Sequence, residues 1–212
     1  MKFLLIGVTG KMGVGKSLFS SFLKKKGIPV YSSDERGKIL MNQTEIIKKN
    51  IIKHFGNNSY KEKKINKTYL SNIVFQNPNA LKLLCSIVHP WISVDFKKWI
   101  FSIRGKFFYL IKESALLFES KSYKECDHVI TITSPVEEMI SRVIKRDNLN
   151  EYQIVNRLKN QMSNKKRKEK SSLFIENNSS VNYLKKKSDE IHNLFIDLYK
   201  NQDIQKKYGK RR

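Results

Sequence analysis

The sequence of 212 residues predicts an α/β protein, a three-layer sandwich in which helices cover both faces of a parallel five-stranded sheet. Short apolar runs, as expected of strands buried on both faces, alternate with segments whose apolar residues repeat at helical spacing. This alternation favours parallel strands joined by crossover helices. A long helical stretch after the second strand interrupts it and predicts a helical insertion.

Five short apolar segments are expected to form the strands. They span residues 2–6, 29–32, 107–112, 128–133 and 173–176. The apolar residues of the first helix are Leu18, Phe19, Phe22 and Leu23. Gly27, preceded by three lysines in the last turn, is typical of a helix C-terminus.

The helix after the fourth strand has a distinct start signal. Ser134 is expected as its N-cap, Pro135 as its first residue and Glu137 as the partner in a capping box. Its predicted core face consists of Val136, Met139, Ile140, Val143 and Ile144. A second helix from about residue 150 is expected to carry Arg157 and Gln161, followed by a basic run over residues 164–170.

These segments predict one domain over residues 1–205. Its core sheet would use residues of about 1–33, 105–134 and 171–200, the last of these including a helix over 181–199. The helical substrate region would cover about 34–104, with a loop at 56–64, and a helical lid about 135–170. Residues 206–212 are expected to form a frayed basic tail.

Residue usage excludes several classes of protein. Cys85 and Cys126 are far apart, with no CxxC pattern and no histidine cluster, so neither a disulfide scaffold nor a zinc site is predicted. The apolar run at residues 3–6 is shorter than the ~7–15 residues of a signal-peptide core, and no segment approaches the ~20 residues of a membrane span. We therefore expect a soluble, cytoplasmic protein with no membrane partner.

The formal net charge of +23 raises the question of nucleic-acid binding. Only eight of the 42 basic residues are arginines, and the lysines are spread along the whole chain. Proteins that bind nucleic acids favour arginine because its planar group makes paired hydrogen bonds to bases and phosphates. Because A/T-rich codons explain the lysine content equally well, we expect no specific nucleic-acid partner and favour an anionic small molecule.

One phosphate-binding motif follows the first predicted strand and opens the first helix. The pattern G-x-x-x-x-G-K-[ST] is matched by Gly10, Lys11, Met12, Gly13, Val14, Gly15, Lys16 and Ser17. In such a P-loop, backbone N–H groups surround the phosphates, the lysine binds the β- and γ-phosphates and the hydroxyl group binds Mg²⁺. We therefore expect ATP as co-substrate, with Mg²⁺ as cofactor, in a P-loop three-layer sandwich.

The features around this motif favour a small-molecule kinase over a GTPase or a motor protein. The third strand ends at Glu113 without an Asp-Glu pair, and no guanine-binding Asn-Lys-x-Asp sequence is present. Glu113 is a candidate to hold Mg²⁺ through water, or it merely closes the strand. The helical insertion and the late basic helix pair are typical of kinases with a substrate region and a closing lid.

The chain resembles the dephospho-coenzyme A kinases in order from residue 3 to about residue 178. The segments that match the family include Gly-Val-Thr-Gly-Lys-Met-Gly-Val-Gly-Lys-Ser at 7–17, Val-Tyr-Ser-Ser-Asp at 30–34, His-Phe-Gly at 54–56 and the stretch 70–75. Others are His-Pro at 89–90, Leu-Leu-Phe-Glu at 116–119, Arg142 with Lys-Arg-Asp at 145–147, Gln161 and Phe-Ile-Glu-Asn at 174–177.

The resemblance implies transfer of the γ-phosphoryl group of ATP to the ribose 3′-hydroxyl of dephospho-CoA, the last step of CoA synthesis. Asp34 and Lys16 would be the catalytic residues, with Asp34 as the base that receives the hydroxyl proton. We favour this catalytic role, although Asp34 also fits the N-cap of the helix that follows it, and both roles can hold together. His89 and Glu119 would bind the substrate, although His89 before Pro90 also fits a structural role that interrupts a helix, and Glu119 a solvated position.

Arg142 and Lys170 would bind ATP, and Arg146 and Arg157 are further candidates to bind phosphates in the lid. For each of the three arginines, a solvated helix face fits equally well. The chain departs from the family pattern at several positions. Lys11 stands for a usual glycine, Ser32 and Ser172 for aspartates, Ala115 for a proline and Lys170 for an arginine.

Kinases of nucleoside monophosphates or shikimate-like acceptors, and a nucleic-acid-binding P-loop protein, remain alternatives. We favour a monomer.

Overall fold

The structure is a computed structural model that describes residues 3–103, 107–147, 149–178 and 180–208, without the side chains of 202–208. Its centre is a sheet of five parallel strands in the order β2–β5–β1–β6–β7. The strands are β1 (Leu4–Thr9), β2 (Val30–Ser32), β5 (Tyr109–Glu113), β6 (His128–Thr133) and β7 (Leu173–Glu176). The predicted α/β class and the parallel five-stranded sheet are confirmed.

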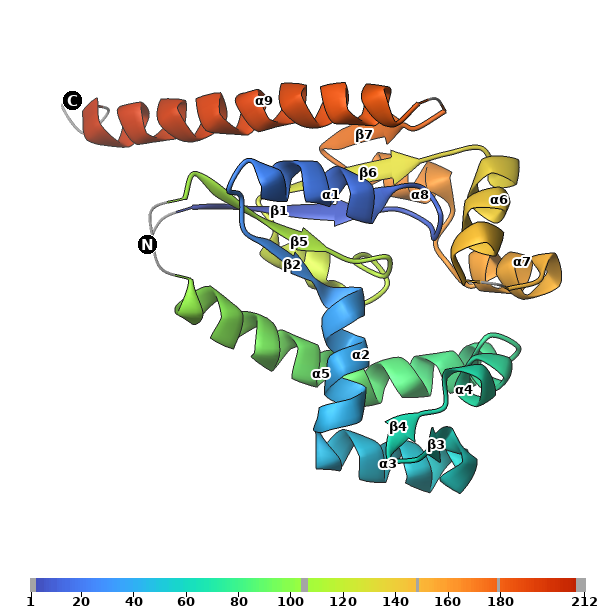
Figure 1. Ribbon diagram of the computed structural model, residues 1–212. Helices are drawn as coiled ribbons and strands as arrows, with labels where there is room; N and C mark the ends of the chain where they lie inside the picture. Colours follow the sequence, from blue (N-terminus) through green and yellow to red (C-terminus); the bar gives the residue numbers. More distant parts are fainter. Residues whose placement is uncertain (1–2, 104–106, 148, 179, 209–212) are drawn as a thin grey trace.

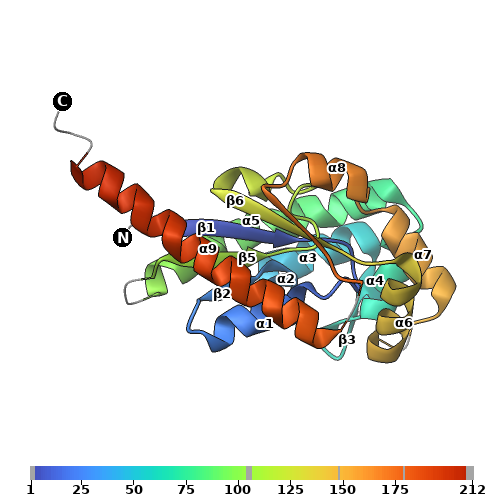
Figure 2. The same cartoon turned by 90° about the horizontal axis from the view of Figure 1, so that it is seen from above.

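Helices cover both faces of the sheet (Figures 1 and 2). On one face, α1 (Lys16–Lys25) and α9 (Val181–Tyr208) pack on the side chains of Leu4, Ile6 and Val8. On the other face, Leu5 lies in a cluster with Phe96 of α5 (Pro78–Ser102). This alternation along β1 explains why its sequence is apolar at nearly every position.

The insertion between β2 and β5 builds a second apolar cluster beside the sheet (Figure 1). Its elements are α2 (Ser33–Gln43), α3 (Glu45–Phe55), β3 (Tyr60–Lys61), β4 (Lys64–Ile65), α4 (Lys67–Val74) and α5. Ile47 and Ile51 of α3 pack there with Val88 of α5. The insertion therefore has its own core, while α2 starts directly at the end of β2.

Three short helices lie between β6 and β7, at one end of the sheet (Figure 1). They are α6 (Val136–Asp147), α7 (Glu151–Lys159) and α8 (Asn164–Glu169). They occupy the region predicted to form the lid. A further 3-10 turn, η2 (Ser122–Glu125), connects β5 to β6.

The loop expected at residues 56–64 contains regular structure. A 3-10 turn, η1 (Asn57–Ser59), precedes the β3–β4 hairpin. Glu62 and Lys63 in its turn have φ values of 50° and 62°, the geometry of a tight two-residue hairpin turn. Glycine or asparagine usually occupies such positions, so this sequence carried no hairpin signal.

Helix α5 continues through Pro90, and the prediction that His89 interrupts a helix is therefore wrong. A proline inside a helix removes one backbone hydrogen bond. Packing on both sides of it offsets this loss, because Val88 lies in the core of the insertion and Phe96 in a cluster against the sheet.

Helix α6 differs from its predicted start and core face. It begins at Val136, and the Ser134 hydroxyl donates to a backbone carbonyl oxygen after β7 in place of capping the helix. Met139 and Val143 are buried as predicted. Val136 and Ile144 are 50% and 41% exposed, and assigning them to the core was wrong, because that side of α6 faces α7 and solvent.

Other differences concern the ends of elements. Strand β1 continues past residue 6 to Thr9, and its Gly7 lies so close to Leu117 that a Cβ atom would be 2.7 Å from the leucine Cδ2. Helix α7 ends at Lys159, so Gln161 lies outside it. Leu18 is 38% exposed, contrary to its expected place on the apolar face of α1.

The last helix is longer than expected. Helix α9 runs to Tyr208, so residues 206–208 are helical and not frayed. Residues 209–212 of the expected tail lie outside the described residues, as does residue 2 of the first predicted strand. None of the helices in the described part of the chain has the length and apolar character required to cross a membrane.

Candidate active site

The P-loop connects the carboxyl end of β1 to the first turn of α1. Gly13 and Gly15 have φ values of 81° and 97°, in the left-handed region that favours glycine. A Cβ atom on Gly13 would lie 2.6 Å from the carbonyl oxygen of Met139 in α6. The loop thus needs glycine both for its backbone path and for its contact with α6.

Two residues from distant segments hold the P-loop in place. The Gln161 Oε1 accepts from the backbone N–H of Met12 at 3.1 Å. The buried Asn177 donates through Nδ2 to the carbonyl oxygen of Val14 at 2.9 Å. Both residues belong to the motifs of the family resemblance, and the structure brings them to the loop.

Lys16 is buried at the start of α1, with 7% of its surface exposed. Its Nζ donates to the carbonyl oxygen of Lys11 at 3.1 Å. Burial lowers the pKa of Lys16, and the negative charges of Asp34 and Glu113 oppose that shift. The ammonium group is therefore held inside the loop, close to two carboxylates.

Ser17 and Glu113 form a direct contact at the mouth of the loop. The Ser17 hydroxyl donates to Glu113 Oε1 at 2.7 Å. Burial raises the pKa of Glu113, and the hydrogen bond from Ser17 and the charge of Lys16 oppose that increase. The two predicted metal residues are thus neighbours.

This pair fits a magnesium ion that arrives with a nucleotide. Mg²⁺ prefers oxygen ligands and is usually bound by one or two protein groups, with phosphates and water completing its shell. The hydroxyl and carboxylate oxygens of the pair suit this chemistry. In the described residues, no group of three His, Cys, Asp or Glu side chains could hold a metal ion by itself.

Asp34 lies at the same edge of the sheet as the P-loop. In the register of the strands, Glu113 at the end of β5 pairs with Ser32 of β2 and with Val8 of β1. Asp34 follows β2 by two residues, at the second position of α2. Ser32 occupies the N-cap position of α2, so the alternative in which Asp34 caps this helix is wrong.

The Asp34 carboxylate is exposed and held by the backbone of the turn after β5. The N–H of Ala115 donates to Asp34 Oδ2 at 3.1 Å and to Oδ1 at 3.4 Å. The Ser114 hydroxyl lies 3.5 Å from Oδ1. This arrangement leaves the carboxylate oriented and accessible, as a base that receives a proton requires.

The two predicted substrate residues have different surroundings. His89 of α5 is half-buried, and burial lowers its pKa while the charges of Asp34 and Glu119 oppose that shift. Glu119 Oε1 accepts from Arg167 Nη2 and from the Met162 N–H, both at 2.8 Å. One oxygen of the Glu119 carboxylate is thus occupied by protein contacts.

The structure separates the two residues that were predicted to bind ATP from the expected lid region. Arg142 of α6 reaches the P-loop, where Nη1 lies 3.4 Å from the Gly13 carbonyl oxygen. Lys170 ends α8 and is exposed, and within the described residues its side chain forms no hydrogen bond or ion pair. Arg146 pairs with Asp147, and Arg157 lies over the ring of Phe75.

Arg167 is a residue that the sequence analysis missed. It was placed in a basic run of α8, yet its side chain is fully buried against the ends of β1 and β5. The available signal was its residue type, because it is the single arginine among the lysines of residues 164–170. A planar group with five donors suits a buried position with several acceptors better than lysine does.

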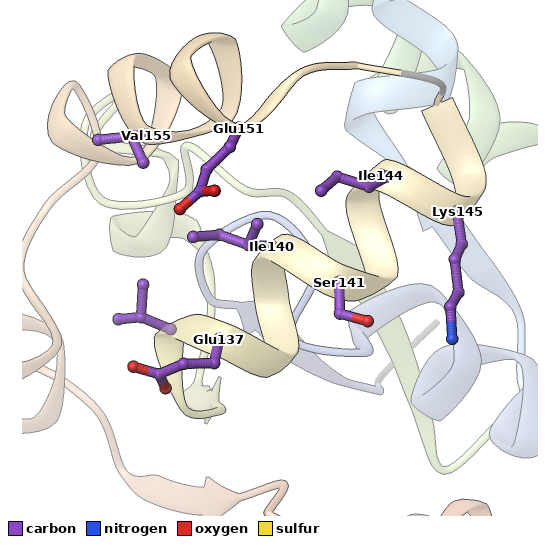
Figure 3. Close-up of a pocket in the computed structure, with 8 residues that line it drawn as sticks. Glu137, Ile140, Ser141, Ile144, Lys145, Glu151 and Val155 are labelled. Atoms are coloured by element: carbon purple, nitrogen blue, oxygen red, sulfur yellow. The ribbon is translucent and has the colours of Figure 1, made fainter.

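A separate groove of about 570 Å³ lies between α6 and α7 (Figure 3). Ile140 and Ile144 of α6 and Val155 of α7 line it together with Glu137 and Glu151. Its lining does not include Met139 and Val143, the residues of α6 that lie next to Gly13. The groove therefore accounts for the exposed apolar residues of α6 and is distinct from the phosphate site.

Residues 4–182 match the family model for dephospho-CoA kinase. The chain belongs to the dephospho-CoA kinase family. A dephospho-CoA kinase of Fusobacterium nucleatum is 35% identical over 188 residues, which cover 88% of this chain and 96% of the relative. The prediction of a kinase of this family is confirmed.

Two solved structures share the fold of this chain. The dephospho-CoA kinase from Campylobacter jejuni matches with a TM-score of 0.65 and 26% identity, over 93% of this chain and 98% of that one. The protein TT1252 from Thermus thermophilus shares the fold, with a TM-score of 0.75 at 23% identity over 91% of this chain and 98% of that one.

The departures from the dephospho-CoA kinase pattern have local structural consequences. Ser172 Oγ accepts from the Val129 N–H at 3.1 Å. Serine is shorter than the aspartate of the family pattern, yet its side chain still accepts a hydrogen bond from the backbone. Ser32 remains at the N-cap of α2, without a side-chain capping bond. Ala115, where a proline is usual, supplies the N–H that holds Asp34, a contact that proline cannot make.

Proposed function

We propose that this protein transfers the γ-phosphoryl group of ATP to the ribose 3′-hydroxyl of dephospho-CoA, giving CoA and ADP. The observation that carries the proposal is the convergence of the P-loop lysine, the Ser17–Glu113 pair and Asp34 at one carboxyl edge of the sheet. Open α/β sheets bind their ligands at this edge. The family supports dephospho-CoA as the acceptor.

In this proposal the P-loop binds the triphosphate and orients it. Backbone N–H groups of residues 10–17 surround the phosphates, and Lys16 neutralises charge on the group being transferred. Ser17 and Glu113 would hold Mg²⁺, which adds positive charge at the phosphates. Arg142 extends from α6 to the loop and would contribute to ATP binding.

Asp34 would act on the acceptor side. Its carboxylate, held by the Ala115 N–H, accepts the proton of the 3′-hydroxyl as that oxygen bonds to the γ-phosphorus and the bond to the ADP oxygen breaks. His89 would contact the acceptor from α5. The charge of a deprotonated Asp34 also attracts the hydroxyl proton before transfer.

ADP release tests the acceptor. With Mg·ATP, we expect dephospho-CoA to stimulate ADP release, and AMP and shikimate to leave it at the level without acceptor. Dephospho-CoA that lacks the ribose 3′-hydroxyl is the matched control and should give no product. Equal stimulation by AMP or shikimate would overturn the acceptor assignment.

We propose a monomeric cytoplasmic enzyme, in line with its two free cysteines, and no specific nucleic-acid ligand. Nonspecific electrostatic binding gives dissociation constants of only ~10⁻⁴–10⁻⁶ M at physiological salt. A sub-micromolar dissociation constant for duplex or single-stranded DNA or RNA would contradict this part.

A further inference from the structure

Ala115, in the turn after β5, connects two charged groups through its backbone. Its N–H donates to Asp34 Oδ2 at 3.1 Å, and its carbonyl oxygen accepts from Arg167 Nη2 at 3.0 Å. Among the interactions of the described residues, the two Asp34 oxygens are the acceptors of this N–H. The position of the Asp34 carboxylate therefore depends mainly on this residue, beside the longer 3.5 Å contact from the Ser114 hydroxyl.

Arg167 fixes that residue from the other side. Its guanidinium group is fully buried, and burying a charge is costly unless it is paired and hydrogen-bonded. Nη1 donates to Thr9 Oγ1 at 2.8 Å, Nη2 donates to Glu119 Oε1 at 2.8 Å as well as to Ala115, and Nε donates to the Met162 carbonyl oxygen at 3.2 Å. Because the group is planar and rigid, these contacts fix its orientation.

The same guanidinium group also contacts the ATP side. Thr9 is the last residue of β1 and directly precedes Gly10 of the P-loop. Met162 directly follows Gln161, whose side chain accepts from the P-loop N–H of Met12. Arg167 thus contacts the start of the nucleotide loop and the residue that orients Asp34.

We propose that Arg167 is a positioning residue for phosphoryl transfer, which acts through the Ala115 backbone to hold Asp34 in register with the P-loop. The proposal rests on the proposed role of Asp34 as the base on the acceptor side. Phosphoryl transfer depends on alignment, and a displacement of about 1 Å can cost ~10²-fold in rate. A purely structural arginine would instead change stability without depending on the Ala115 N–H.

The first arm of the test removes the N–H alone. Proline has no N–H and is tolerated at the start of a helical turn, which is where Ala115 lies, ahead of the Leu116–Ser120 hydrogen bond. We expect Ala115→Pro to lower kcat about tenfold with the KM for ATP within about twofold of wild type. Ala115→Gly keeps the N–H and is the matched control, with kcat within about twofold of wild type.

The second arm asks whether Arg167 acts through that N–H. Arg167→Lys keeps the charge and loses the planar fork. We expect it to lower kcat about tenfold in the wild-type background and less than about twofold in the Ala115→Pro background, because coupled residues are not additive. Equal fold losses in the two backgrounds would overturn the proposal.

Further variants separate stability from positioning. Ser171→Ala removes a hydroxyl that donates to the Arg167 carbonyl oxygen at 2.6 Å, so it should lower the Tm while leaving kcat nearly unchanged. If Arg167→Lys does not fold, Glu119→Gln replaces it in the same two backgrounds. We then expect a smaller loss of kcat in the wild-type background and no loss in the Ala115→Pro background.

Asp34→Asn distinguishes this proposal from the proposed function. If Asp34→Asn keeps wild-type kcat, the role of Asp34 fails and the positioning role fails with it. If Asp34→Asn loses kcat while Ala115→Pro does not, only the positioning role of Ala115 and Arg167 is overturned.

Discussion

The two halves of the proposed site are built in different ways. The nucleotide half is a continuous segment, residues 10–17, in which Lys16 is buried and donates to a carbonyl oxygen of its own loop. The acceptor half is assembled from separate segments. Asp34 is exposed at the start of α2, and its anchor, Ala115, lies 81 residues further along the chain.

This difference indicates where each half is sensitive to change. The nucleotide half depends on residue types within one motif, so a single substitution there removes a chemical group. The acceptor half depends on tertiary contacts, so it is also sensitive to substitutions that move Asp34 without altering it. Substitutions in the nucleotide half should therefore act by removing a chemical group, whereas substitutions in the acceptor half should also act by displacing Asp34.

The largest expected effect is that of Lys16→Met. It removes the cation at the transferring phosphoryl group while it keeps much of the apolar volume, and we expect kcat to fall by about 10³-fold or more. Lys24→Met, at an exposed lysine of the same helix, is the control and should keep wild-type turnover. Near-native kcat in a folded Lys16→Met variant would contradict the role of Lys16.

The same variant has an expected effect on stability with a defined sign. Burial lowers the pKa of Lys16 from its ordinary value of 10.5, so its charged form costs stability in the fold. This cost is fully present below the lowered pKa and disappears as pH rises through the ordinary value. At pH 7, Lys16→Met should therefore keep or raise the Tm, as thermal unfolding without ligands measures.

The next effect is that of Asp34→Asn, which keeps the size of the side chain and removes its ability to take a proton. We expect kcat to fall by ~10²–10⁴-fold, the usual contribution of a general base, with the KM for ATP and the Tm almost unchanged. Glu35→Gln, an exposed neighbour that pairs with Lys38, is the control and should leave kcat unchanged. A raised KM for ATP with normal kcat would place Asp34 on the nucleotide side instead.

The nucleotide half and the strand segments of the sheet could be predicted from the sequence because both depend on local signals. The P-loop pattern spans eight consecutive residues, and buried parallel strands appear as short apolar runs. Strand ends were predicted less well. Strand β1 includes Gly7, which is required by close packing against Leu117 and not by a turn.

The acceptor half was predicted only as a set of separate residues. The resemblance named Asp34, His89 and Glu119, but nothing in the sequence says that Glu119 is paired with a buried arginine. Arg167 lies in a run of basic residues that indicates a solvated helix. Only the tertiary structure shows that its side chain is buried against the ends of β1 and β5. Local patterns cannot show which charged residues share a buried contact.

The smallest expected effects concern the two residues predicted to bind ATP from the lid region, and here the structure separates what the sequence treated alike. Arg142 lies 3.4 Å from the Gly13 carbonyl oxygen and is held by an ion pair with Glu138, so Arg142→Ala should raise the KM for ATP about three- to tenfold. Lys170 is exposed, and an exposed lysine contributes little, so Lys170→Ala should change that KM less than about twofold. Steady-state kinetics at saturating acceptor measures both. A larger effect of Lys170→Ala would show that the end of α8 moves toward the nucleotide when the lid closes, because no fixed position of this residue explains it.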